Sequence, residues 1–243
     1  MIRHAEAMEL TAFENARLLD LLRALTDEQW RAATECTRWT VRDIAVHLIA
    51  SAQAQAHPTE FVRQVLAGRR LSARIGATHW VDGLNEAQLR ARTAWTGSQL
   101  PALWQQHAAT ALAARRRMPA AIRALPVLPL GTGLGVHVGR QPLSYLFDMG
   151  FTRDVWMHRI DIARAAGTTP ELTAGHDGRI IADIVEEWSE RHGQPYLVTL
   201  TGPAGGVFQK DDGDHQTVDA VDFVRILSGR ADGPGILRHK LPL

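Results

Sequence analysis

The stretch from Pro142 to Gly167 reads PLSYLFDMGFTRDVWMHRIDIARAAG. Its spacing predicts an amphipathic helix with a core-facing stripe made of Phe147, Phe151, Asp154, His158, Asp161 and Ala165. The centre of that stripe carries a carboxylate and an imidazole. Asp154 and His158 are four positions apart, so their side chains lie one above the other on the same face.

Three interpretations of the pair Asp154 and His158 remain open from spacing alone. An isolated buried carboxylate is costly, so it must be paired or bound to a cation. The pair is therefore a hydrogen-bonded contact to another helix, part of a divalent metal site, or a general base with its orienting partner. Asp161 is expected either to act as a capping residue or to pair with Arg159, Arg164 or a residue of another helix.

Composition narrows the class of protein. The 243 residues fit one large domain or two small ones, and 45% hydrophobic content is ordinary for a globular chain. A formal net charge of +1 argues against nucleic acid or an anionic membrane as partner. The single Cys36 excludes an internal disulfide and fits a reducing compartment. With no signal peptide and no long apolar run, we expect a cytoplasmic protein.

The order of expected elements predicts an α+β chain in two parts, with a boundary near residue 168. Helices are expected at 7–25, 41–55, 58–68, 86–96, 98–117 and 174–192, with a loop up to about residue 81. A Pro/Gly-rich loop is expected at 118–141; its Gly131, Gly133 and Gly135 lack the preceding strand of a dinucleotide-binding unit. Strands are expected at 196–200, 205–209, 215–218 and 235–243, with a helix at 219–227. The run Arg115 to Arg117 is interpreted as a solvated helix end.

The second expected helix offers a further site residue. Thr40 and Asp43 resemble a capping box that starts this helix, with aspartate in place of glutamate. His47 lies beside Ile44 at the edge of the apolar stripe, where it is either a core histidine or a third metal ligand. Helical bundles build metal sites from inward-facing groups on different helices. Two histidines and a carboxylate leave positions open for water or substrate; zinc fits best, and Ni, Fe, Co or Mn are also accepted.

Several motifs together resemble a known family. They are Trp30, the stretch CTRWTVRD from Cys36 to Asp43 leading to His47-Leu48, Asn85 opening a helix, and DVWMHRIDIARA from Asp154 to Ala165. The chain is similar in these motifs to the mycothiol-dependent maleylpyruvate isomerase family, within the DinB-like metalloprotein superfamily. Its end resembles the sterol-carrier-like domain found with this family, in the stretches 200–206 and 222–230.

The resemblance implies both an architecture and an activity. It implies a DinB-like four-helix bundle over residues 1–168 and a small α+β domain over 169–243. It implies a divalent metal at His47, Asp154 and His158, and mycothiol as a thiol cosubstrate. The family's isomerase has glutamate where this chain has Asp154. The reaction implied is isomerisation or S-transfer on a small electrophile.

Three expectations complete the interpretation. Arg230, with Arg225 behind it, is the candidate to hold a substrate carboxylate, although a structural role for either is equally open. Cys36 is expected to be structural, near Trp39, and not a nucleophile. The alternative function is a non-catalytic, metal-stabilised binding protein for a small ligand, because fold does not dictate activity. Either a monomer or a homodimer is compatible with the sequence.

Overall fold

The computed structural model describes residues 2–36, 38–77, 80–126 and 140–242. The chain folds into two compact units: the larger holds the described residues of 4–126 and 140–169, and the smaller holds 2–3 and 170–242. The described residues are mostly helical with one three-stranded sheet, which confirms the α+β class. The separate domains predicted at 1–168 and 169–243 stay a prediction. The expectation for Gly131, Gly133 and Gly135 concerns residues outside those that the structure describes.

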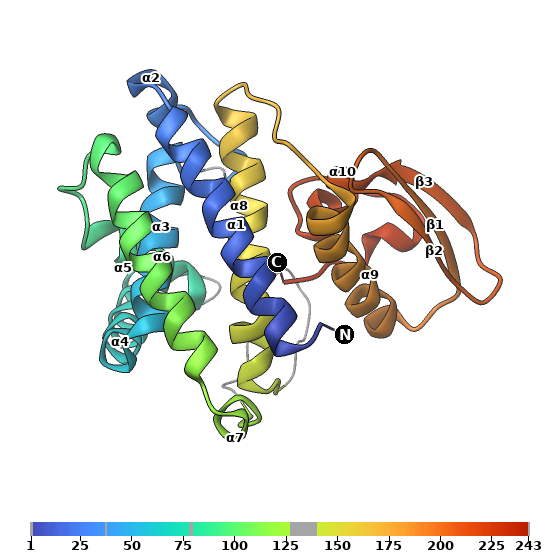
Figure 1. Cartoon of the computed structure of the whole chain (residues 1–243), viewed down its shortest axis with the longest axis horizontal. Helices are drawn as coiled ribbons and strands as arrows, with labels where there is room; N and C mark the ends of the chain where they lie inside the picture. Colours follow the sequence, from blue (N-terminus) through green and yellow to red (C-terminus); the bar gives the residue numbers. More distant parts are fainter. Residues whose placement is uncertain (1, 37, 78–79, 127–139, 243) are drawn as a thin grey trace. The chain divides into compact units, whose positions relative to one another are not determined.

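Helices build the larger unit (Figure 1). The long ones are α1 (His4–Ala24), α3 (Val41–Ala56), α4 (Pro58–Ile75), α5 (Trp80–Arg90), α6 (Leu100–Arg117) and α8 (Phe151–Ala165). The short ones are α2 (Asp27–Trp30), η1 (Gly97–Gln99), α7 (Ala120–Arg123) and the π-helix η3 (Tyr145–Gly150). Four of them contact one another in a closed order: α1 packs on α6, α6 on α3, α3 on α8, and α8 on α1. None of the described helices has the length and apolar character needed to cross a membrane.

The capping box predicted at the start of α3 is present. Thr40 Oγ1 accepts the amide N–H of Asp43, and the Asp43 carboxylate accepts the N–H of Thr40. This fixes where the helix begins and therefore which of its residues face inward. Its apolar residues join a buried core whose members include Leu18, Leu22, Ile44, Leu48, Ile49, Leu100, Trp104, Val155 and Ile162.

Between α3 and α6 the structure corrects the sequence analysis. The helix expected to end at Gly68 continues to Ile75, and α5 begins at Trp80, before the expected start. Asn85 consequently lies inside α5 and does not open a helix. Gly68 lies at a close contact: a Cβ there would come within 2.6 Å of Leu84 Cα. Glycine therefore serves helix packing at this position and does not end the helix.

A second correction concerns the arginine run at the end of α6. Arg116 and Arg117 are exposed, but Arg115 is buried. Its guanidinium donates to the carbonyl oxygens of Phe147 at 2.6 Å and Asp148 at 3.1 Å, both in η3. The buried guanidinium thus has backbone acceptors in place of water.

The smaller unit contains η4 (Ala174–Gly178), α9 (Arg179–His192), β1 (Tyr196–Thr201), β2 (Gly206–Lys210), β3 (His215–Asp219), α10 (Ala220–Leu227) and η5 (Gly235–Arg238). The strand order is β2-β1-β3; β1 runs antiparallel to β2 and parallel to β3. Residues of β1 alternate between buried and half-buried, as expected for a strand with one covered face. The strand predicted at 235–243 is wrong, because η5 is a 3-10 helix after Pro234.

Candidate metal centre

Helices α3 and α8 bring His47, Asp154 and His158 together. His47 Nε2 lies 3.6 Å from Asp154 Oδ2, and His158 Nε2 lies 3.5 Å from Asp154 Oδ1. The centroids of the two imidazole rings are 5.4 Å apart. One donor atom from each residue fits within a set whose members are all within 4.8 Å of one another. The three residues that the sequence analysis singled out, from two distant parts of the chain, thus meet at one point.

A buried carboxylate orients the His158 ring. Asp161 Oδ2 lies 2.9 Å from His158 Nδ1, and the Asp161 side chain is completely buried. Because a carboxylate accepts, Nδ1 carries the proton and donates it. The lone pair of the neutral ring is therefore on Nε2, the atom that faces Asp154. This is the arrangement by which an outer carboxylate fixes a metal-binding histidine.

A buried amide orients the His47 ring in the same way. His47 Nδ1 lies 2.8 Å from Gln88 Oε1 of α5, and an amide oxygen only accepts. Nδ1 of His47 therefore donates, and its Nε2 is also left with a lone pair toward Asp154. With these hydrogen bonds, the Nε2 atoms of both rings offer a lone pair toward the carboxylate of Asp154.

Such a convergence calls for a positive charge, and its dimensions fit a metal ion. In tetrahedral coordination at zinc distances of about 2.0–2.1 Å, neighbouring ligand atoms lie about 3.3–3.4 Å apart. The separations of 3.6 Å to Asp154 Oδ2 and 3.5 Å to Asp154 Oδ1 are too long for good hydrogen bonds, and each is close to that edge length. Small shifts of the side chains would complete the coordination, so the residues fit a divalent ion.

The pKa of His47 also indicates that this centre favours positive charge. Burial lowers the pKa of His47, but the Asp154 carboxylate and the hydrogen bond to Gln88 raise it more. The net pKa lies above the usual 6.5. The centre therefore attracts positive charge, which in this setting is either a proton or a metal ion.

One side of the centre is closed and the other is accessible. The Trp39 ring lies against both imidazoles, with centroid distances of 5.1 Å to His47 and 6.0 Å to His158. The two histidine side chains are 11% and 8% exposed, whereas Asp154 is 29% exposed. The carboxylate is therefore the most solvent-exposed of the three candidate ligands.

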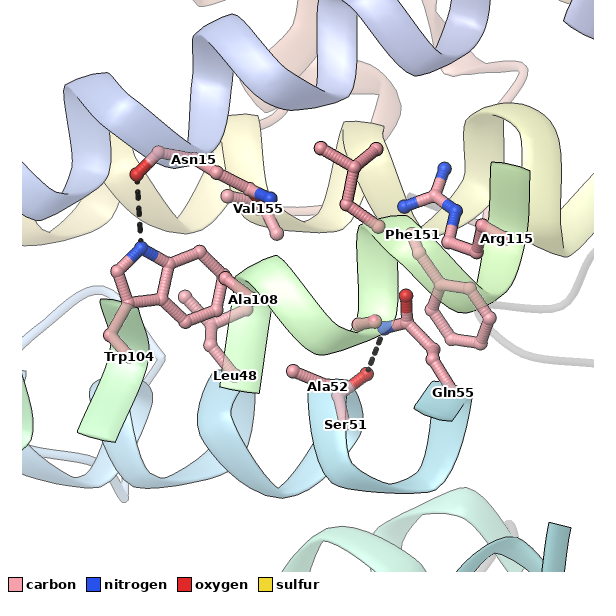
Figure 2. A pocket seen from close by; sticks show the side chains of 12 residues that line it. Asn15, Leu48, Ser51, Ala52, Gln55, Trp104, Ala108, Arg115, Phe151 and Val155 are labelled. Carbon is pink, nitrogen blue, oxygen red and sulfur yellow. Dashed lines mark hydrogen bonds between the residues drawn. The ribbon is translucent and has the colours of Figure 1, made fainter. Parts of the chain in front are cut away.

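A nearby cavity is too small to be the substrate site. Figure 2 shows it between α3, α6 and α8, lined by residues that include Leu48, Ser51, Trp104, Arg115 and Val155. Its volume is about 10 Å³, which leaves room for about one water molecule. A cavity of this size does not admit an organic molecule.

Two further residues from the sequence analysis, Cys36 and Arg230, lie outside the set of three candidate ligands. The thiol of Cys36 donates to Asp161 Oδ2 at 3.5 Å, and the carbonyl of Cys36 accepts the N–H of Trp39 at 2.7 Å. Cys36 is thereby tied to Trp39 and to the carboxylate that orients His158. Arg230 follows α10 in the smaller unit and is half-buried, and its contact with a substrate stays a prediction.

Sequence reasoning missed the outer partners of the two histidines. Asp161 is three residues from His158, so helical spacing does allow that contact. Gln88 gives no such signal, because it lies on a different helix from His47 and a polar residue in an amphipathic helix is usually exposed.

Comparisons with known proteins identify the family of the chain and structures with a similar fold. Residues 12–163 match the family model described as the mycothiol maleylpyruvate isomerase N-terminal domain. The chain is similar to a crystal structure of the mycothiol-dependent maleylpyruvate isomerase, with a TM-score of 0.58, 18% identity, and coverage of 96% of this chain and 92% of that one. A histidine-to-alanine mutant of that enzyme matches with a TM-score of 0.58, 17% identity, and coverage of 95% and 90%. No curated protein matches the chain.

Proposed function

The chain belongs to the mycothiol maleylpyruvate isomerase N-terminal domain family, and we propose that it is a metal- and thiol-dependent isomerase or S-transferase. His47, Asp154 and His158 hold a divalent ion, zinc before Ni, Fe, Co or Mn. The thiol is mycothiol, and the substrate is a small electrophile. The proposal includes a DinB-like four-helix bundle joined to a sterol-carrier-like domain, in a cytoplasmic monomer or homodimer.

One observation supports this proposal above all others. Three acceptor groups from α3 and α8 converge at 3.5–3.6 Å, and both imidazoles have their other nitrogen committed to a buried partner. A merely structural Asp–His contact would place a ring N–H on the carboxylate at hydrogen-bond distance. With Nδ1 of each ring donating to its buried partner, both Nε2 atoms offer a lone pair toward Asp154, which supports a bound cation.

Each side chain of the proposed centre has a separate role. A bound divalent ion lowers the pKa of a coordinated thiol, so that the thiolate is available near neutral pH. Gln88 and Asp161 hold the two rings, and Trp39 packs against both of them and excludes water from that side. The accessible side at Asp154 admits thiol and electrophile. Arg230 is proposed to hold a substrate carboxylate through paired N–H donors.

Metal analysis of variants tests the proposal. Wild-type protein purified with zinc is expected to hold a stoichiometric amount of metal, and His47→Ala and His158→Ala are expected to lose it, because two remaining ligands bind weakly. The matched control is His57→Ala, which replaces the exposed histidine at the end of α3. Elemental analysis is the measurement. Equal metal content in wild type and both ligand variants would contradict the proposed site.

Thiol-dependent turnover tests the activity itself. The wild type with zinc and mycothiol is expected to isomerise or conjugate a small electrophile such as maleylpyruvate, and His158→Ala is expected to lose this activity. If chelation lowers the melting temperature but no thiol and electrophile pair is turned over, the protein is instead a metal-stabilised binder.

A further inference from the structure

A chain of buried amides leads away from His47. Its Nδ1 lies 2.8 Å from Gln88 Oε1, and Gln88 Nε2 donates to Gln64 Oε1 at 2.7 Å. Gln64 Nε2 donates in turn to Ala50 O at 2.9 Å and to Glu60 Oε1 at 2.8 Å. The exposed fractions of Gln64 and Gln88 are only 3% and 4%. Glutamine side chains are mostly exposed in folded proteins, so the burial of these two calls for a structural or functional explanation.

The far end of this chain fixes the direction of every bond in it. The Ala50 carbonyl can only accept. The Glu60 carboxylate accepts from Arg63 at 2.6 Å, and this bond above all lowers the pKa of Glu60 to about 2. Both N–H groups of Gln64 are therefore committed to acceptors, and its oxygen faces Gln88. Gln88 must then present its N–H to Gln64, which turns its oxygen toward α3.

We propose that Gln88 and Gln64 form a one-way hydrogen-bond relay that keeps His47 in the tautomer with its lone pair on Nε2. Both glutamines are then positioning residues for the metal, although neither touches it. The inference rests on the proposed function, because it assigns the relay to the same metal centre. An amide turned the other way at Gln88 would favour the tautomer protonated on Nε2, and that proton would occupy the place of the ion.

The relay also explains why a glutamine suits position 88. An amide has one acceptor and one donor end, so it can pass a fixed direction from Gln64 to His47. Loss of such an outer partner typically lowers metal affinity by about 10–100-fold. A purely structural role, in which the glutamines only attach α4 and α5 to α3, would lower stability without changing the ring tautomer.

Zinc affinity measured by competition with a chromogenic chelator separates these roles. Gln88→Leu is expected to bind zinc about 10–100-fold more weakly than wild type, and Gln64→Leu also more weakly. Gln55→Leu is the matched control: this half-buried α3 glutamine donates to Ser51 Oγ at 3.1 Å, outside the relay. It is expected to keep wild-type affinity. Unchanged affinity in Gln88→Leu, or an equal loss in Gln55→Leu, would overturn the relay.

A second readout works without any metal. In metal-free wild-type protein, above the pKa of histidine, ring ¹⁵N NMR shifts of His47 are expected to show a protonated Nδ1 and a bare Nε2. Gln64→Leu is expected to give a mixture of tautomers, because the Gln88 amide is then free to turn. A bare Nδ1 in the wild type would disprove the relay. If the tautomer is as expected but the wild type binds no zinc, the proposed function fails while the relay stands.

Discussion

At the scale of single residues, His192 in the smaller unit links stability to pH. Its Nδ1 accepts the backbone N–H of Gln194 at 3.0 Å, and its ring lies 4.3 Å from that of Trp188. Burial, followed by the charges of His239 and Lys210, lowers the pKa of His192 to about 4. The folded protein therefore keeps this ring neutral where an unfolded chain would protonate it.

The sign of the pH effect follows from this shift. The unfolded chain binds a proton near pH 6.5, whereas the folded chain binds it only near pH 4. The contribution of His192 to stability is complete above about pH 6.5 and is lost as the pH falls toward about 4. We expect His192→Phe, which keeps a ring but cannot titrate, to flatten the stability profile in this window. Urea unfolding of wild type and variant at a series of pH values measures it; parallel profiles would contradict the assignment.

The candidate ligands could be predicted from the sequence because their signal is local. Asp154 and His158 share one helical face, so spacing alone brings them together. For Asp161, spacing offered Arg159 and Arg164 as partners, but these bind Glu14 and Glu35 on other parts of the chain. Contacts between helices decide such choices, and no periodicity within one helix reports them.

At the scale of helices, glycines set the contact between α4 and α5. A Cβ at Gly83 would lie 2.4 Å from the carbonyl oxygen of Gly68 and 2.6 Å from the amide nitrogen of Ser72. Both atoms belong to the backbone of α4, so they cannot move aside as a side chain would. The helices can approach this closely only because both contact positions lack a side chain.

Gly83→Ala is therefore expected to force α4 and α5 apart. Overpacking of this kind costs about 1–3 kcal/mol. The expected result is a lower free energy of unfolding by about that amount, measured by urea denaturation, with weaker zinc binding because Gln64 and Gln88 lie on the separated helices. Gly175→Ala is the control, since a Cβ at Gly175 meets nothing within 4 Å. Equal stability of Gly83→Ala and wild type would show that the helices adjust freely.

The same contact explains an error of the sequence analysis. Glycine is a poor helix former, so Gly68 reads as a helix end. In the structure the favourable packing of α4 against α5 outweighs that preference, and the helix continues to Ile75. Arg115 is a similar case: its charge favours an exposed position, but the carbonyls of η3 provide buried partners.

At the scale of the whole molecule, the fold class was easier to predict than the residues at which individual helices and strands begin and end. The alternation of residues in β1 and the turn residues after it correctly predict this strand and its partner β2. The last expected strand fails because the residues after Pro234 form a 3-10 helix, which a short apolar stretch does not distinguish from a strand. Family membership rests on residues 12–163, which contain all three candidate ligands.

The pairing of α3 with α8 has a consequence for the route by which the chain folds. The two helices are far apart in sequence, so joining them closes a long loop, whereas α4 and α5 are neighbours that can associate early. An ion that links α3 to α8 needs this late contact already made. We expect zinc to slow unfolding in stopped-flow experiments and to leave the refolding rate nearly unchanged. The metal would then slow the unfolding of a chain whose helices have already packed together. A refolding phase that zinc accelerates would show instead that the ion brings the two helices together.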